Sequence, residues 1–282
     1  MCTCQLDLVL FLNMLNKISF NTVEKALAAK KSGMSLSQQD FYQFNFSDLD
    51  LNEIVLSQSV LVRTSFRAAQ LKEADLSGAD LRASDLSKAS LIRANLQGAC
   101  LYRADLSGAD LSGADLSGAQ LQGVHYDSQT IFPEGFAYKA SGAIGPGANL
   151  NGAALNTANL RHTDLQGANL LGAYLGGADL TGANLKGARL VQADLRRAIL
   201  TGACLRNTRL NGVNLSGVDL RAADLTNAAF EEFESIAGAD FSLVQGLTEA
   251  MKAIILSQTA EQLDTMHPLT RNTTRESLEQ ST

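Results

Sequence analysis

The chain of 282 residues has no tryptophan, only three histidines and four cysteines, and no apolar run long enough to cross a membrane. Its most apolar stretch, residues 6–15, is too short for a membrane helix and contains Asp7 and Asn13. That stretch also lacks the basic start and the A-x-A cleavage site of a secretory signal peptide. We therefore expect no membrane association, and we interpret residues 5–17 as a helix packed on one end of the fold.

The few cysteines and histidines argue against a metal site and a disulfide framework. Cys2 and Cys4 form a close pair, but a C-x-C pair alone is weak evidence for metal chemistry, and we expect no metal and no cofactor. The histidines available to complete a site are His125, His162 and His267. Cys100 and Cys204 occupy positions expected to face outward, and free exposed thiols indicate a reducing cytoplasm. Whether Cys2 and Cys4 pair on oxidation stays open.

Catalytic motifs are missing as well. The sequence has no G-x-S-x-G elbow, no Walker phosphate loop, no G-x-G-x-x-G before a helix and no His-x-x-x-His. Aspartates are frequent, but nearly all recur at one position of a repeat, where a solvated carboxylate is expected to titrate normally. We therefore predict that the protein is not an enzyme and has no catalytic residues.

What the sequence does contain is a leucine, or occasionally a phenylalanine, at every fifth position. The register runs unbroken from Phe41 to Leu121 and again from Leu150 to Phe230, which gives 34 central positions, 30 of them leucine. Two residues before most centres stands a small residue, usually alanine, although Phe44, Leu49 and Ile54 occupy this position in early repeats. After the centre come turn-forming pairs such as Ser-Gly and Thr-Gly. Such regularity indicates an internally repeated structure.

A period of five fits neither a continuous helix nor a continuous strand. On a helix, steps of five residues would wind the leucines around the cylinder instead of aligning them on one face. In a strand, an odd period would send successive leucines to opposite faces. The chain must therefore turn once per repeat, and stacked coils would pair their backbones at about 4.8 Å and enclose columns of leucine and alanine.

Repeats such as 109–113 (ADLSG) and 183–187 (ANLKG) resemble the A(D/N)LXX consensus of pentapeptide repeat proteins, especially the cyanobacterial members. The resemblance covers about 170 of the 282 residues. It implies an all-β solenoid, a right-handed quadrilateral β-helix with four repeats, or 20 residues, in each coil. On that model the 34 repeats make about eight and a half coils, roughly 40 Å of solenoid.

A solenoid exposes its core and unpaired backbone at each end, so short α-helical caps are expected at both ends. Asn21 is expected to cap a helix over 22–32, Thr248 a helix to about Ser257, and Thr259 with Gln262 a shorter capping box. The predicted organisation is an N-terminal helical cap (1–40), a first repeat block (41–124), an inserted loop (125–147), a second block (148–242), a C-terminal helical cap (243–268) and a polar tail (269–282). The tail is expected either to be mobile or to lie along the solenoid.

The surface carries the candidate binding features. Residues 41–121 have a net charge of −3 and residues 150–230 of +3, whereas 231–282 carry −6. Outward apolar side chains next to arginine are typical of an interface core with a charged rim. The predicted partner-binding patch comprises Leu171, Tyr174, Arg189, Val191, Arg196, Arg197 and Arg209. In the inserted loop, Phe132, Phe136 and Tyr138 either cover the solenoid wall or recognise a partner.

These features of the sequence are compatible with two functions. The first is a non-enzymatic protein-interaction scaffold or regulator, as the resemblance to cyanobacterial pentapeptide repeat proteins implies, acting in the cytoplasm as a monomer or weak dimer. The alternative is a DNA mimic that binds DNA gyrase or topoisomerase, as gyrase-protecting members of the family do with an acidic rod. The positive second block disfavours mimicry, and the absence of a dominant basic stripe disfavours direct nucleic-acid binding.

Overall fold

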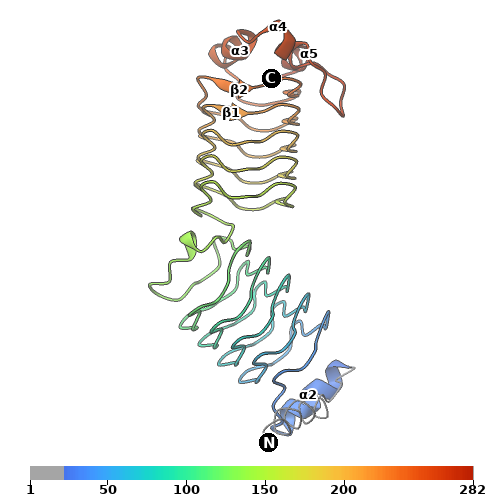
Figure 1. The fold of residues 1–282 in the computed structure, drawn as a ribbon, viewed down its shortest axis with the longest axis vertical. Helices are drawn as coiled ribbons and strands as arrows, with labels where there is room; N and C mark the ends of the chain where they lie inside the picture. Colours follow the sequence, from blue (N-terminus) through green and yellow to red (C-terminus); the bar gives the residue numbers. More distant parts are fainter. Residues whose placement is uncertain (1–21, 282) are drawn as a thin grey trace, which may run out of the picture. The chain divides into compact units, whose positions relative to one another are not determined.

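The computed structural model describes residues 22–281, and these form two compact units (Figure 1). The N-terminal unit is Met1–Ala137, described from residue 22 onward, and the C-terminal unit is Tyr138–Thr282, described to residue 281. In each unit the chain winds through a stack of coils. The expected helix at 5–17, with Cys2 and Cys4 and the expected N-cap Asn21, lies outside the described residues.

Each coil contains 20 residues, and neighbouring coils run parallel. The residue before each central leucine pairs with the residue 20 positions later, as in Asn184 with Cys204. The leucine N–H itself donates to the next coil, from Leu185 to the Cys204 carbonyl at 2.8 Å. Because every coil repeats these bonds, most of the backbone of a repeat is paired with the coil above or below. The chain is therefore a β-helical solenoid, as its sequence predicts.

Each coil has four corners, one in each repeat, and the backbone changes direction at each of them. At each corner the central leucine carbonyl accepts a bond from the N–H three residues later, as from Ala183 to Leu180 at 2.9 Å. The second corner residue has a positive φ, for example +69° at Gly187, which is typical of a type II turn. Glycine adopts this conformation at little cost, which explains why glycine recurs at this position of the repeat. We call each stack of repeats 20 residues apart a wall.

Central leucines and phenylalanines fill the interior. Of the 34 central positions, all except Leu155, which is half-buried, are buried. The alanines two residues earlier are mostly buried too, and their small size lets the leucines of opposite walls meet. Longer strands occur at one place, where β1 (Val213–Asn214) pairs in parallel with β2 (Phe233–Ser235).

Helix α2 (Val23–Lys31) begins the described part of the N-terminal unit. Its N-cap is Thr22, whose side chain accepts the Lys25 N–H, so the expectation of Asn21 as the cap is wrong by one residue. Ala26 and Ala29 are buried. The Lys30 ammonium donates to the Asp50 carbonyl at 2.9 Å, and it thereby satisfies an acceptor of the first coils.

The expected inserted loop, 125–147, is divided between the units. Its first part continues the solenoid, since His125 pairs with Asp105 and Ile131 with Asp110. One extra residue enlarges the corner between them, and there Asp127 Oδ1 accepts the Gly108 N–H at 2.9 Å. This one-residue shift breaks the period of five, which is why the sequence alone reads as an insertion. The later part includes the 3₁₀ helix η1 (Tyr138–Ala140).

Three helices follow the last coil of the C-terminal unit: α3 (Glu249–Leu256), α4 (Ala260–Leu263) and α5 (Thr274–Glu279). Thr248 caps α3 as expected, and Thr259 caps α4. The Gln262 side chain does not complete the expected capping box, because its Oε1 accepts the Ile236 N–H at 2.9 Å. The capping box of this region instead joins Thr273 and Glu276 in α5.

The segment 269–282, expected to be a polar tail that is mobile or lies along the solenoid, contains α5 in the structure. Its residues replace the next coil: Ser277 Oγ accepts the Phe241 N–H at 3.0 Å, and the Gln280 carbonyl accepts the Leu243 N–H at 3.1 Å. Thr274, Ser277 and Leu278 are buried. Of the two alternatives, the structure agrees with a tail that lies against the solenoid, because its polar groups bind the unpaired edge instead of facing water.

Leu185→Ala is expected to lower the free energy of unfolding by about 2–5 kcal/mol, because the side chain is fully buried and its removal leaves a cavity between coils. Lys186→Ala, at the adjacent exposed corner, is the matched control and should change stability by less than about 0.5 kcal/mol. Urea denaturation followed by circular dichroism measures both. Equal effects would contradict the inward orientation of the leucines.

Candidate protein-binding walls

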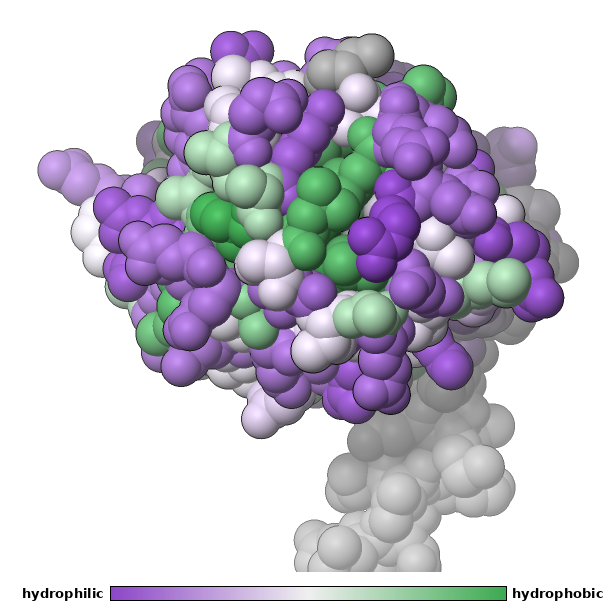
Figure 2. Space-filling view, turned by 90° about the horizontal axis from the view of Figure 1, so that it is seen from above, coloured by the Kyte–Doolittle hydropathy of each residue, from purple (hydrophilic) through white to green (hydrophobic). Residues whose placement is uncertain are grey.

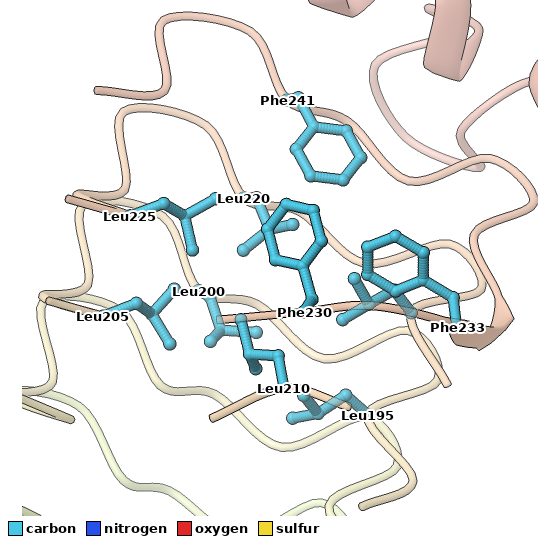
Figure 3. Close-up of a pocket in the computed structure, with 10 residues that line it drawn as sticks. Leu195, Leu200, Leu205, Leu210, Leu220, Leu225, Phe230, Phe233 and Phe241 are labelled. Carbon is cyan, nitrogen blue, oxygen red and sulfur yellow. The ribbon is translucent and has the colours of Figure 1, made fainter. Parts of the chain in front are cut away.

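One internal space of the C-terminal unit is too small for a ligand. The space between its last coils is lined only by leucine and phenylalanine side chains, including Leu210, Phe230 and Phe241 (Figure 3). Its volume of about 10 Å³ is close to that of a single water molecule, and the lining provides no polar partner for one. Within 22–281, no group of three or more His, Cys, Asp or Glu side chains could hold a metal ion. Binding features therefore have to be sought on the outer walls.

Four residues of the predicted patch lie on one wall of the C-terminal unit, which we call the arginine wall. Its repeats are centred on Leu150, Leu170, Leu190, Leu210 and Phe230. Arg189 and Arg209 are paired neighbours in adjacent coils, and both are exposed. Leu171 and Val191 lie beside them in adjacent coils, where the Gly172 N–H donates to the Val191 carbonyl at 2.9 Å. Neither arginine has a carboxylate within 4.0 Å among residues 22–281.

Tyr174, Arg196 and Arg197 lie on the next wall of the same unit. Tyr174 is 54% exposed and pairs with Asp194 in the following coil. Arg196 is bound to that aspartate through two bonds of 2.9 and 2.7 Å. Hydrogen bonds from Arg196 hold the pKa of Asp194 below its usual value. The structure thus separates the predicted patch into two walls, and the charge of Arg196 is already neutralised.

The aromatic residues of the 125–147 segment contact one another within the N-terminal unit. The Phe132 ring lies 5.5 Å from the buried Tyr126 ring, edge to face, and 6.1 Å from the Phe136 ring, stacked. Phe132 and Phe136 are half-buried. Tyr138 belongs to the C-terminal unit, where it is half-buried and the Lys139 ammonium lies 5.8 Å from its ring centre.

One wall of the N-terminal unit carries exposed aromatic side chains that the sequence analysis did not single out. We call it the tyrosine wall, and its repeats are centred on Phe41, Leu61, Leu81, Leu101 and Leu121. Tyr42 and Tyr102 are 47% and 42% exposed on it. The signal was present in the sequence, because positions 42, 62 and 102 fall into one column once residues are stacked at intervals of 20.

Comparison with known proteins agrees with this geometry. The family model described as pentapeptide repeats matches in eight copies over more than half of the chain. The matched residues are 50–87, 89–125, 146–182, 173–212 and 198–232. The chain belongs to the pentapeptide repeat family. No curated protein sequence matches it.

Solved structures of the family resemble the chain to different extents. HetL, a pentapeptide repeat protein involved in heterocyst differentiation regulation from the cyanobacterium Nostoc sp. strain PCC 7120, is 28% identical over 79% of this chain and 96% of its own, with a TM-score of 0.34. Rfr23 from the cyanobacterium Cyanothece 51142 is 33% identical over 34% of this chain and 62% of its own, with a TM-score of 0.21. QnrB1, a plasmid-mediated fluoroquinolone resistance protein, is 20% identical over 77% and 97%, with a TM-score of 0.26. Since these TM-scores are low, the family assignment rests on the repeat model.

The C-terminal end of this pentapeptide repeat protein is a further apolar surface. Seen from that end, apolar side chains gather at the centre of the face and polar side chains surround them (Figure 2). Large hydrophobic residues that are exposed in this part of the chain are Leu243, Leu256, Met266 and Leu269. None of the helices in residues 22–281 is both long and apolar enough to cross a membrane.

An Asp-Leu-Arg motif occurs three times among the repeats and forms a local ion pair each time. In the most buried example, Asp219 accepts two bonds from the Arg221 guanidinium, at 2.9 and 2.8 Å. Burial by itself would raise the pKa of Asp219, but the bonds from Arg221 keep that pKa below its usual value. In the more exposed pair, hydrogen bonds from Arg82 lower the pKa of Asp80. Arginine two residues after aspartate therefore neutralises a wall instead of creating a charged site.

Asp219→Asn is expected to lower the free energy of unfolding by about 1 kcal/mol at pH 7, because it removes a charge-assisted pair. A carboxyl whose pKa is lowered on folding stabilises above its unfolded pKa of about 3.9 and loses this effect as pH falls through the folded pKa. The difference from the wild type should therefore shrink below about pH 4. Asp80→Asn is the control with a smaller effect, since the Asp80 side chain is 28% exposed and that of Asp219 only 4%. A difference that persists unchanged at pH 3 would contradict this account.

Proposed function

We propose that the protein is a non-enzymatic interaction scaffold that binds a protein partner through its solenoid walls. The observation that carries the proposal is the arginine wall, where exposed Arg189 and Arg209 lie without a carboxylate beside Leu171 and Val191. Arginine and bulky apolar residues are the types that contribute most to protein interfaces. Their side chains project from a backbone that the coil hydrogen bonds fix, so little conformational entropy is lost on binding.

The finer features of the proposal follow from family membership and from the surface. We take the solenoid to be a right-handed quadrilateral β-helix whose terminal helices act as caps, and the protein to act in the cytoplasm as a monomer or weak dimer. Cys100 and Cys204 are free and partly exposed thiols, which supports a reducing compartment. Tyr174 and Arg197 on the adjoining wall, and Phe132, Phe136 and Tyr138 of the 125–147 segment, are proposed as secondary contacts.

DNA mimicry receives less support from the surface. A mimic of duplex DNA needs continuous columns of negative charge, whereas the columns here are interrupted. Along one wall of the C-terminal unit the column reads Asp164, Asn184, Cys204 and Asp224, and Asp224 lies 3.7 Å from the Arg206 guanidinium. The paired Asp-Leu-Arg motifs remove further negative charge. We therefore propose no direct action on gyrase.

Arg189→Glu combined with Val191→Asp is expected to abolish capture of the partner from a lysate of the source organism, because it places negative charge at the centre of the arginine wall. Lys186→Glu with Gln166→Asp is the matched control. It makes the same charge change on exposed residues of a different wall and should leave capture intact. Tagged proteins and quantitative mass spectrometry measure the difference. Capture retained by the arginine-wall variant would dismiss this wall as the binding surface.

In a gyrase supercoiling assay the protein is expected to cause neither inhibition nor protection, since its walls do not reproduce a phosphate backbone. Increasing amounts of protein should leave the distribution of plasmid topoisomers unchanged, with and without a fluoroquinolone. A dose-dependent change in supercoiling would favour the mimic over the scaffold.

A further inference from the structure

The tyrosine wall differs from the other three walls of the N-terminal unit in its apolar surface. Among residues 40–118, the large hydrophobic side chains that are exposed on this wall are Tyr42, Val60 and Tyr102, at 47%, 39% and 42%. The other three walls together have only Val55. Val62, which is half-buried, lies in the same column as the two tyrosines. Within residues 40–118, exposed large hydrophobic side chains are therefore concentrated on one wall. Nearer the end of the unit, the exposed Ile131 lies on a different wall, where it pairs with Asp110.

The charge of the tyrosine wall also differs from that of its neighbours. Over residues 40–118 it carries three arginines against two aspartates, so its formal charge is +1. On the other three walls the acids outnumber the bases, by three to two, four to two and two to none. An approaching anionic group is thus attracted to one wall of the unit and repelled by the other three.

Two of the three arginines on the wall are available to a partner. Arg82 is held by Asp80 through bonds of 2.7 and 2.6 Å. Arg63 is exposed, and no carboxylate of residues 22–281 lies within 4.0 Å of it. The Arg103 guanidinium likewise has no carboxylate partner there and lies 5.0 Å from the centre of the Tyr102 ring. This contact holds the charge over an aromatic surface.

The coil ladder fixes the spacing of these groups. Asp40 pairs with Val60, Val60 with Asp80, and Asp80 with Cys100, so successive coils are in register along the wall. Arg63 and Arg103 are two coils apart, which corresponds to about 10 Å. Tyr42 and Tyr102 are three coils apart, or about 14 Å. The wall therefore presents two cations at a defined distance. Val60 lies in the coil of Arg63 and Tyr102 in the coil of Arg103, and the coil between them carries the Asp80–Arg82 pair.

We infer that the tyrosine wall binds an acidic segment of a partner protein. Two carboxylates of the segment, about 10 Å apart, pair with Arg63 and Arg103, and its apolar side chains cover Val60 and the two tyrosines. This inference rests on the proposed scaffold function and extends it to a different wall and to a stated partner chemistry. Pairing of desolvated arginine with carboxylate gives orientation, and the tyrosines supply contact area.

A protein fits this wall better than a nucleic acid does. Phosphate backbones require many basic contacts, but only two free arginines are present and the adjoining walls are negative. The apolar side chains include valines, which offer no plane for stacking a base, although they pack well against aliphatic groups. A peptide with both carboxylates and apolar side chains can pair with the arginines and pack against the valines and tyrosines.

The test uses a defined probe, a fluorescent peptide with four Glu-Pro-Pro repeats. In the polyproline II conformation its glutamates lie on one side about 9 Å apart, close to the spacing of the two arginines. Saturable binding is expected by fluorescence anisotropy, weakening as salt is raised. The same peptide with glutamine in place of glutamate should bind at least about tenfold more weakly, because the carboxylates are the groups that pair with arginine.

Variants of the protein identify the wall. Arg63→Glu with Arg103→Glu should lose peptide binding by at least about tenfold, as should the milder Arg63→Gln with Arg103→Gln if the reversal impairs folding. Arg67→Glu with Lys88→Glu makes the same charge change on exposed residues of the adjoining wall and should keep binding within about twofold. Circular dichroism checks that each variant is folded.

Three outcomes would overturn the inference. These are no binding of the glutamate peptide up to about 1 mM, equal loss in the control variant, or preferential binding of a single-stranded RNA oligonucleotide that depends on the same two arginines. The peptide titration reports on the tyrosine wall alone. Capture from a lysate by the arginine-wall variant tests the scaffold function instead. The two experiments therefore distinguish a failure of this inference from a failure of the scaffold function.

Discussion

The pairing of each coil with the next through backbone hydrogen bonds is the interaction on which the rest of this structure depends. Most central leucines donate their N–H to a carbonyl of the next coil, with Leu116 and Leu121 at the end of the N-terminal unit as exceptions. The residue before the leucine donates its own N–H to the preceding coil, as Asn184 does to Thr163. Each bond contributes only about 0.5–1.5 kcal/mol net, but the bond recurs in most repeats and leaves no freedom in register. The position of each outward side chain on a wall follows directly from this register.

At the two ends of the described chain, other groups bind the backbone N–H and C=O groups that have no neighbouring coil. At the C-terminal end, Gln262, Ser277 and Gln280 supply acceptors to N–H groups of the last coil. At the other end of the described chain, the Lys30 ammonium binds a carbonyl that would otherwise pair with a preceding coil. Polar residues of helices thus close an edge that would otherwise recruit another strand.

Much of the fold could be predicted from the sequence because the repeat specifies it at each position. The leucine of each repeat predicts the core, the alanine predicts the narrow interior, and the turn pair predicts the corner. Thr248 also indicated the start of a helix. Departures from the period could not be recognised. One extra residue near Asp127 interrupts the period of five, so the sequence does not show that the coil continues. The polar composition of α5 likewise does not show that its side chains bind the edge of the solenoid.

Prediction of the candidate site was less complete, because it depends on contacts between coils. Stacking the residues at intervals of 20 predicts that Arg189 lies beside Arg209, and the backbone pairing of these two residues confirms it. The sequence did not show that Arg196 is bound to Asp194 while Arg189 is not, since side-chain conformation decides between them. The net charge of a whole repeat block does not indicate the tyrosine wall, because a block contains four walls of different charge.

The central claim is that residues 20 apart are direct neighbours on a wall. In a protein whose native cysteines are replaced by serine, new cysteines at Lys186 and Arg206 should form a disulfide on mild oxidation, because paired strands place their Cα atoms about 5 Å apart. Cysteines at Lys186 and Thr201, which lie on different walls, should stay reduced. Cross-linking measured by gel mobility and mass spectrometry of peptides gives the answer. A disulfide in the second pair and not in the first would contradict the 20-residue coil and every surface assignment built on it.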